Sequence, residues 1–313
     1  MSREIVFEGV SKFYGEVLGV NRVTIAIPPG ITSLVGPNGS GKTTLMNLAT
    51  GLLQPSKGTI SVLGIRPDDP AVLFRKVGYC TQFDSFPIGM TGLSFISSFL
   101  RLHGSSKSEA DARAEAALQR VGMREAGPRR IAGYSKGMRQ RVKLAQAVVH
   151  DPEVVLLDEP LNGLDPMARA EVMELFRDLA KNGRHVIISS HILHEVDQLS
   201  DRVILVKGGY IVAEGGIHGV RTEVATEPLS VLVRCDRPSY LAARLFSTNH
   251  TMEVSIHEDR KGLVVRTLDP EHLYRVLNHA VVADGLEIER VSASDDDVAA
   301  VYRYLIEGEG DVH

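Results

Sequence analysis

One stretch of eight residues constrains the fold more than any other feature of this 313-residue chain. Residues 36–43 read G-P-N-G-S-G-K-T, directly after the expected buried strand Thr32–Val35 and at the start of an expected helix over Thr43–Ala49. A glycine-rich loop between a strand and a helix turns backbone N–H groups around a phosphate and adds the positive helix N-terminus. The sequence therefore predicts an α/β protein that binds a phosphate group in this loop.

The residues of this loop have separate expected tasks. Lys42 is expected to reach the β- and γ-phosphates of a nucleotide, and the Thr43 hydroxyl to ligate Mg²⁺. A glycine-rich turn that only caps a helix is the alternative interpretation. The expected phosphate-binding residues are Gly36, Pro37, Asn38, Gly39, Ser40, Gly41, Lys42, Thr43 and Thr44.

A second pattern is an apolar strand that ends in two carboxylates. Val154–Leu157 is followed by Asp158 and Glu159. Such a strand delivers both acids to the carboxyl edge of a sheet, where ligands of α/β folds bind. Asp158 is placed to hold Mg²⁺ through water, and Glu159 to polarise an attacking water. The alternative is a strand that simply leaves the core for solvent.

Short β-branched runs alternate with helical stretches through the first two-thirds of the chain, which predicts a largely parallel sheet with helices on both faces. The first thirty residues look like an antiparallel hairpin added to that sheet. The further expected strands are Val77–Cys80, Val186–Ser189 and Val203–Val206, and the further expected helices are Met138–Val149, Ala168–Lys181 and Leu193–Leu199.

A domain boundary is expected at Gly215-Gly216. We expect residues 1–215 to form one domain, 216–228 a linker, and 229–313 a C-terminal accessory domain. The order strand, helix, strand, strand, helix, strand and a last helix predicts a small α+β domain of the split βαβ, ferredoxin-like type.

Composition narrows the class of protein. Apolar residues make up 43% and charged residues 24% of the chain, as in ordinary globular proteins. The net charge of -4 argues against a nucleic-acid partner, which usually requires a basic excess. No secretory leader is expected, and no apolar run approaches the roughly 20 residues that cross a bilayer. Any path across a membrane must therefore come from another chain.

The segment Tyr134–Met138 resembles the signature loop of the ATP-binding cassette (ABC) ATPases, and the resemblance covers roughly residues 3–215. The usual sequence Leu-Ser-Gly-Gly-Gln is altered: Ser135 and Gly137 are kept, while Lys136 and Met138 replace the first glycine and the glutamine. The resemblance implies an ABC ATPase fold with an antiparallel β-subdomain and a helical subdomain at about residues 83–150. It also implies that Ser135 and Gly137 meet the γ-phosphate of ATP bound to a second copy, or to a homologous subunit, in a head-to-tail nucleotide-sandwich dimer.

Four more positions fit this family by order and spacing, although each alone has an ordinary structural explanation. Gln82 matches the loop glutamine that senses Mg²⁺ and the γ-phosphate, and His191 the switch histidine. Asp165 matches the loop that crosses the dimer seam, and Tyr14 the aromatic residue that stacks on adenine.

The segment from Phe83 to Gly104 is rich in aromatic and apolar residues, and in this family it leads into the subdomain that docks the membrane partner. Helical spacing favours Phe95, Phe99 and Leu102 as core. The expected exposed docking residues are Phe83, Phe86, Pro87 and Met90.

The resemblance implies an ATP-hydrolysing subunit of an ABC transporter, bound to a separate transmembrane permease at the cytoplasmic face of the membrane. The alternative is a soluble ABC-type ATPase outside transport. The DNA-maintenance type carries a long coiled coil, and the interval from Thr43 to Ser135 has no sustained heptads. The translation-factor type normally has two cassettes, whereas this chain has one phosphate loop. Export is favoured over import by the altered signature, the C-terminal domain and residues 291–298, which resemble the Ser-Leu-Glu-Asp-Val-Phe segment of exporter subunits.

Overall fold

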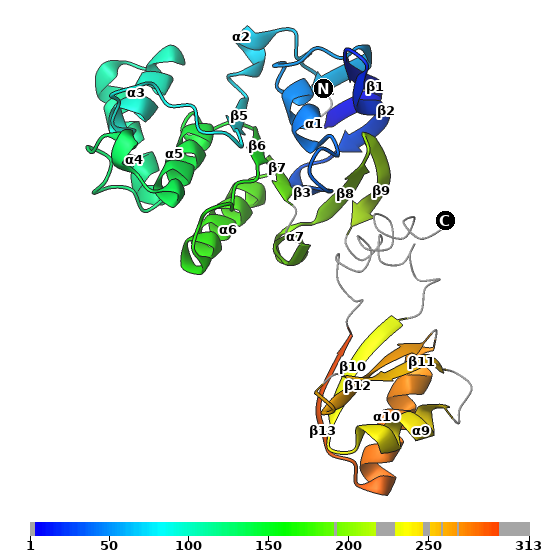
Figure 1. Ribbon diagram of the computed structural model, residues 1–313. Helices are drawn as coiled ribbons and strands as arrows, with labels where there is room; N and C mark the ends of the chain where they lie inside the picture. The colour runs from blue at the N-terminus through cyan, green and yellow to red at the C-terminus, as the bar shows by residue number, and fades with distance from the viewer. Residues whose placement is uncertain are drawn as a thin grey trace. The chain divides into compact units, whose positions relative to one another are not determined.

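The computed structural model describes residues 4–190, 193–216, 229–246, 251–257, 259–267 and 269–293. The chain forms two compact units, Met1–Glu214 and Gly215–His313, which are drawn in Figure 1. Each unit has a buried apolar core made of its own residues.

The larger unit is built on a six-stranded sheet with the strand order β5-β6-β7-β3-β8-β9. The pairs from β5 through β8 are parallel, which confirms the predicted parallel sheet. The strands are β3 (Gly30–Val35), β5 (Val77–Cys80), β6 (Val154–Asp158), β7 (His185–Ser190), β8 (Arg202–Lys207) and β9 (Tyr210–Gly216).

A second, antiparallel sheet has the order β2-β1-β4. The N-terminal hairpin that the sequence predicted is confirmed as the pair β1 and β2. Its strands are β1 (Ile5–Tyr14), β2 (Val17–Ile27) and β4 (Lys57–Val62).

The helices of the larger unit begin mainly at residues whose side chains accept a backbone N–H. Thr91, Ser106, Ser135 and Asp165 are such N-caps, and each satisfies a backbone donor of the first turn. The cap at Ser135 starts its helix two residues earlier than the sequence predicted. The helices are α1 (Lys42–Ala49), α2 (Pro70–Leu73), α3 (Gly92–Leu102), α4 (Lys107–Arg120), α5 (Lys136–Val148), α6 (Pro166–Lys181) and α7 (Leu193–Leu199).

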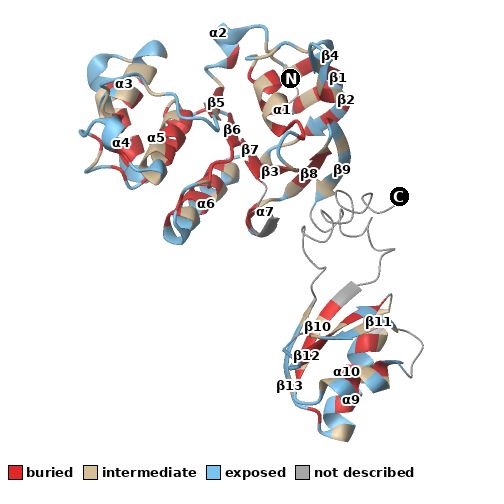
Figure 2. Ribbon diagram, viewed as in Figure 1, coloured by how far each residue is buried: buried red, intermediate tan, exposed pale blue. Residues whose placement is uncertain are grey.

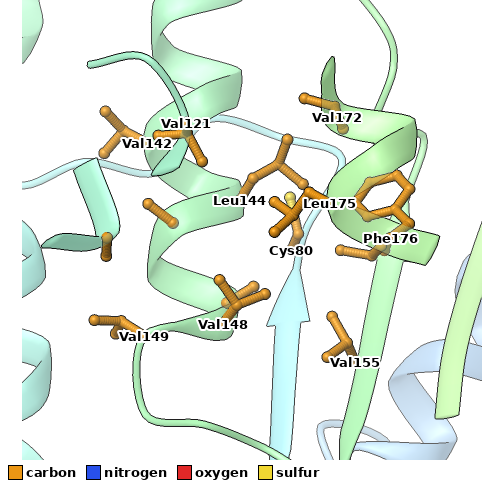
Figure 3. Close-up of a cluster of buried hydrophobic side chains, with 14 of the residues drawn as sticks. Cys80, Val121, Val142, Leu144, Val148, Val149, Val155, Val172, Leu175 and Phe176 are labelled. Atoms are coloured by element: carbon orange, nitrogen blue, oxygen red, sulfur yellow. The ribbon is translucent and has the colours of Figure 1, made fainter. Parts of the chain in front are cut away.

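Both faces of the parallel sheet are covered, so its strands are apolar on both sides. Along β6, Val154 and Leu156 belong to the core shared with α1 and the antiparallel sheet. Val155 and Leu157 belong to the core shared with α5 and α6, where Figure 3 shows side chains from both helices around Cys80. Burial raises the pKa of the Cys80 thiol to about 12, as expected for an inert cysteine. Figure 2 shows these inner strands as buried.

Three expectations about the segment after β5 were wrong. Met90, expected to be exposed, is of intermediate exposure. Leu102, expected in the core, is 87% exposed, because it lies about 200° around α3 from the fully buried Leu100. Phe86, expected on an exposed patch, is partly buried and packs edge-on against Phe95 with ring centroids 5.1 Å apart. Phe83 is 76% exposed, as expected.

The smaller unit contains a four-stranded antiparallel sheet in the order β11-β12-β10-β13. Its element order confirms the predicted split βαβ fold, with α9 and α10 contributing to the core. The last helix predicted by the sequence lies outside the described residues. The elements are β10 (Leu229–Cys235), α9 (Pro238–Phe246), β11 (Thr251–Ile256), β12 (Gly262–Thr267), α10 (Pro270–Asp284) and β13 (Ile288–Ala293).

Candidate functional site

The glycine-rich loop connects β3 to α1. Gly41 precedes α1 with φ of 115°, and a Cβ atom there would lie 2.8 Å from the Gly19 carbonyl oxygen. Only glycine fits this position. The Lys42 Nζ donates to the carbonyl oxygens of Gly36 at 2.8 Å and Pro37 at 2.9 Å. The loop therefore closes around its own lysine.

Lys42 carries a buried charge, since the residue is only 6% exposed. Burial lowers the pKa of its ammonium group, and the nearby Glu159 and Asp158 carboxylates oppose that shift. A cation that has lost its water is stabilised by an anion in contact with it. The electrostatics of the loop thus favour a bound phosphate.

The two carboxylates lie beside this loop at the carboxyl edge of the sheet. Asp158 is the last residue of β6, and its Oδ2 accepts a hydrogen bond from Thr43 Oγ1 at 2.7 Å. Glu159 follows with a left-handed φ of 52°, and its Oε2 accepts a hydrogen bond from Asn162 Nδ2 at 2.8 Å. A non-glycine residue in this conformation is strained unless its surroundings hold it, a feature that clusters at functional sites.

Ser189 joins the two acids, and the sequence analysis gave it no role. It lies opposite Asp158 in the parallel pairing of β6 and β7. Its Oγ donates to Asp158 Oδ1 at 2.5 Å and accepts from the Glu159 N–H at 2.9 Å. The available signal was its position at the end of the neighbouring strand. Asn162 was also missed, although it lies three residues after Glu159.

The mouth of the site is formed by residues from other parts of the unit. The Tyr14 hydroxyl lies 3.3 Å from Thr44 Oγ1, and Lys12 Nζ lies 5.7 Å from the centroid of the Tyr14 ring. Tyr14 is 45% exposed, so its ring is open to a ligand. Together these groups form one cleft of about 370 Å³ lined by Tyr14, Val17, Leu18, Gly19, Asn38, Gly39, Ser40, Gly41, Lys42, Thr43, Thr44, Gln82, Asp158 and Glu159.

The donor set of the cleft fits a magnesium nucleotide. Among the described residues, the buried Ser40 Oγ has no hydrogen-bond partner, a costly arrangement that a ligand oxygen would relieve. Thr43, Asp158 and Gln82 supply hydroxyl, carboxylate and amide oxygens, the type of ligand that Mg²⁺ prefers. The described part of the chain holds no cluster of three or more His, Cys, Asp or Glu side chains suited to a metal. Phosphate oxygens would have to complete the coordination.

Three of the expected site residues lie elsewhere. Ser135, Gly137 and Asp165 line a separate hollow with Lys136 and Gly163, and none of them lines the cleft. Ser135 Oγ accepts the Met138 N–H at 3.2 Å. Asp165 Oδ1 accepts the Ala168 N–H at 2.9 Å, and this bond holds the pKa of its carboxyl below the usual range. His191, the remaining expected residue, lies outside the described residues.

A buried lysine connects the cleft to this hollow through α5, the helix that begins after Ser135. Lys143 Nζ donates to the carbonyl oxygens of Thr81 at 3.0 Å and Gln82 at 3.1 Å, and lies 3.1 Å from Asp84 Oδ1. Arg139 Nε donates to Asp84 Oδ2 at 2.7 Å. Burial raises the pKa of Asp84, but these two cations outweigh it and the pKa is lowered. The Gln82 loop is thereby attached to α5.

Comparison with known proteins places the chain in a family. The family model for the ABC transporter matches residues 20–162. A relative from Bacillus subtilis, the uncharacterized ABC transporter ATP-binding protein YxlF, is 32% identical over 300 residues, covering 96% of this chain and 98% of its own. Nod factor export ATP-binding protein I of Rhizobium johnstonii is 32% identical over 85% of this chain and 84% of its own.

A solved structure agrees with the sequence relatives. A dimeric ATP-binding cassette in a post-hydrolysis state, bound to ADP and Pi, superposes with a TM-score of 0.63 and 26% identity, covering 68% of this chain and 98% of its own. The chain therefore belongs to the family of ABC transporter ATP-binding proteins. It is the ATP-binding, ATP-hydrolysing subunit of an ABC transporter, and the alternative of an ATPase outside transport finds no support in these comparisons.

The described helices show no sign of a membrane span. Across the described residues, none combines the length and the apolar character that crossing a bilayer requires.

Proposed function

We propose that two copies of this chain close head to tail around two molecules of ATP, and that hydrolysis reopens the dimer. The observation that carries the proposal is the separation of the two candidate sites. The cleft holds Lys42, Asp158 and Glu159, whereas Ser135 and Gly137 line a different hollow of the same chain. In a head-to-tail dimer, the hollow of one copy would complete the cleft of the other.

Within the cleft, the binding residues act on the phosphates. Lys42 would exchange its carbonyl partners in the loop for the β- and γ-phosphate oxygens of ATP. Thr43 and Gln82 would ligate Mg²⁺ directly, and Asp158 would do so through water. When bound, Mg²⁺ supplies positive charge that stabilises the negative charge on the transferred phosphoryl group. The Tyr14 ring would stack on adenine.

Glu159 is the residue that we assign as general base. The Ser189 hydroxyl accepts its backbone N–H, and Asn162 donates to its carboxylate, so both its backbone and its side chain are held in place. A carboxylate fixed beside the phosphate loop can take a proton from a water aimed at the γ-phosphate. His191 would contact the same γ-phosphate, as in the family.

The second copy would contribute the hollow. Ser135 and the N–H of Gly137 stand at the N-terminus of α5, where backbone donors and the helix dipole favour an anion. Asp165 and its loop would cross the seam between the copies. Loss of the γ-phosphate removes these contacts, and the dimer then opens.

We further propose that the chain works at the cytoplasmic face of a membrane, attached to a separate permease, and that it drives export. The relatives support this, since one is named as a Nod factor export protein. The docking surface that we favour is a hollow lined by the partly buried Phe99 and by the exposed apolar side chains of Leu52, Phe74 and Leu102, which fit the apolar face of a partner helix. Purification from detergent-solubilised membranes tests the partner: a co-purifying transmembrane chain is expected, and its absence would contradict this assignment.

Residues 229–313 are proposed as an accessory domain that follows a linker at 216–228. Its separate core supports this division, because no residue of that core belongs to either core of the larger unit.

The dimer proposal is tested by Glu159→Gln, which removes the base but keeps the size of the side chain. We expect ATP turnover to fall at least about 100-fold, as for loss of a general base. Because ATP then persists, the variant should form a dimer with ATP and remain monomeric with ADP. Light scattering after gel filtration measures both states. Hydrolysis at the wild-type rate would show that Glu159 is not the base.

A further inference from the structure

Lys136 is the first residue of α5, in the signature loop, where the family usually has glycine. Its side chain lies across the loop Asn162–Asp165. A Cβ atom built on Gly163 would lie 2.9 Å from Lys136 Cγ, 2.8 Å from Cδ and 3.0 Å from Cε. Gly163 has φ of 78°, a backbone conformation that residues other than glycine rarely adopt. Because Gly163 has no side chain, the loop leaves room for the aliphatic part of Lys136 to pack against it.

Lys136 as a whole is exposed. Within the described ranges, its ammonium group has no hydrogen bond and no ion pair. Arg141, which lines the same hollow, is paired within its own chain. Its Nη1 donates to the Val121 carbonyl oxygen at 3.0 Å and lies 3.3 Å from Glu171 Oε2. Three basic residues line the hollow, and Arg141 is committed to its own chain. Among the described residues, the side chains of Lys136 and Arg129 form no hydrogen bond or ion pair, and of these two only Lys136 lies beside Ser135 at the start of α5.

The position of this cation is specific. Lys136 directly follows Ser135, whose hydroxyl caps α5, and both residues line the hollow with Gly137. The ammonium charge adds to the positive N-terminus of that helix. The close contact with Gly163 restricts the lysine stem, so less side-chain freedom is lost when the charge meets a ligand.

We propose that Lys136 is a binding residue supplied in trans, whose ammonium group contacts the triphosphate held in the cleft of the second copy. The inference rests on the proposed head-to-tail dimer and adds a residue that the usual glycine cannot replace. A lysine at this point is a compact charge that reaches an anion across an interface. The ATP-bound dimer of this chain should therefore depend on Lys136 and on ionic strength.

The experiment uses the full chain with Glu159→Gln as the background, because this variant keeps ATP intact. Lys136→Met removes the charge and keeps the stem, and Lys136→Arg keeps the charge. Lys107→Met is the matched control, since Lys107 is an exposed lysine at the start of α4 that lines neither the cleft nor the hollow. Light scattering gives the ATP concentration at which half of the chains are dimeric.

We expect Lys136→Met to raise this concentration about tenfold, because each dimer loses two charge contacts. Lys136→Arg and Lys107→Met should stay within about twofold of the background. Salt should raise the half-dimer concentration less steeply for Lys136→Met than for the background, because one screened interaction is gone. ATP affinity of the monomer at low protein concentration should be the same for all four proteins.

The outcomes separate the two proposals. If the background variant never dimerises with ATP, the nucleotide-sandwich dimer itself is contradicted. If the background dimerises and Lys136→Met matches Lys107→Met, the dimer stands and the role of Lys136 is overturned. A loss of monomer ATP affinity in Lys136→Met would also overturn it, because the contact would then lie within one copy.

Discussion

The cleft around Lys42 and the hollow around Ser135 belong to the same folding unit but differ in how their polar groups are satisfied. In the cleft, Lys42, Asp158 and Glu159 are at most 7% exposed and bond to neighbours from the same chain. In the hollow, Ser135, Lys136 and Asp165 are exposed. The charged groups of the cleft are buried and bonded within one chain, whereas Ser135 and Asp165 each cap a helix of their own chain but remain accessible to a partner.

This difference teaches which contacts a single copy can establish before it meets another. The buried charges of the cleft are positioned by folding, at the cost of desolvation. The exposed groups of the hollow are solvated by water in the single chain, so their desolvation cost arises only when a partner binds. Nucleotide binding by one chain and closure of two chains should therefore respond to different mutations.

Lys42→Ala tests the cleft and has the largest expected effect. It removes the one buried cation of the phosphate loop, so ATP affinity should fall at least about 100-fold, or about 3 kcal/mol. Titration calorimetry with ATP measures the loss, with Lys57→Ala as a control on an exposed strand residue. Unchanged affinity would refute the phosphate-loop assignment and remove the distinction between the two sites.

Ser135→Ala tests the hollow with an intermediate effect. ATP affinity of the single chain should stay unchanged, whereas ATP-driven dimerisation of the Glu159→Gln background should weaken about tenfold. The lost helix cap also costs about 1 kcal/mol of folding stability. Ser106→Ala removes the equivalent cap of α4 and controls for that loss. Equal dimerisation of the two variants would mean that Ser135 only caps its helix.

Ser189→Ala has the smallest expected effect and sharpens the view that the cleft is assembled in advance. It removes the hydroxyl that bonds to Asp158 and to the Glu159 N–H. We expect the free energy of unfolding to fall by about 1 kcal/mol and turnover to fall only about threefold. Ser33→Ala is the matched control, because within the described part of the chain that buried hydroxyl bonds only to Ser200. A turnover no lower than that of the control would show that Ser189 is merely structural.

The sequence predicted those parts of the site whose residues are close together in the chain. The phosphate loop depends on consecutive residues between one strand and one helix, and Asp158 and Glu159 depend on the strand that precedes them. Ser189 could not be assigned in the same way, because its role arises from the register of β7 against β6, which pairs residues 31 positions apart. Strand register is a tertiary property that one chain segment does not contain.

The errors have a similar origin. Leu102 was expected in the core from its spacing to Phe95 and Phe99, but the buried face of α3 is set by Ile96 and Leu100. In a helix with many apolar residues, more than one face matches the helical spacing of apolar positions. Packing against the rest of the protein decides which face is buried. The C-terminal fold was easier, because its order of strands and helices selects one common topology.

The attachment of the Gln82 loop to α5 has one more consequence. Lys143 and Asp84 connect the backbone around Gln82 to α5, the helix that begins after Ser135. Because of these contacts, a displacement of the Gln82 loop would also move α5, and the reverse. In the dimer proposed above, nucleotide bound in the cleft of one copy would therefore alter the surface around Ser135 that the same copy presents to its neighbour. The nucleotide state of one copy would then affect the other copy through their shared interface, although the two clefts are not connected to each other.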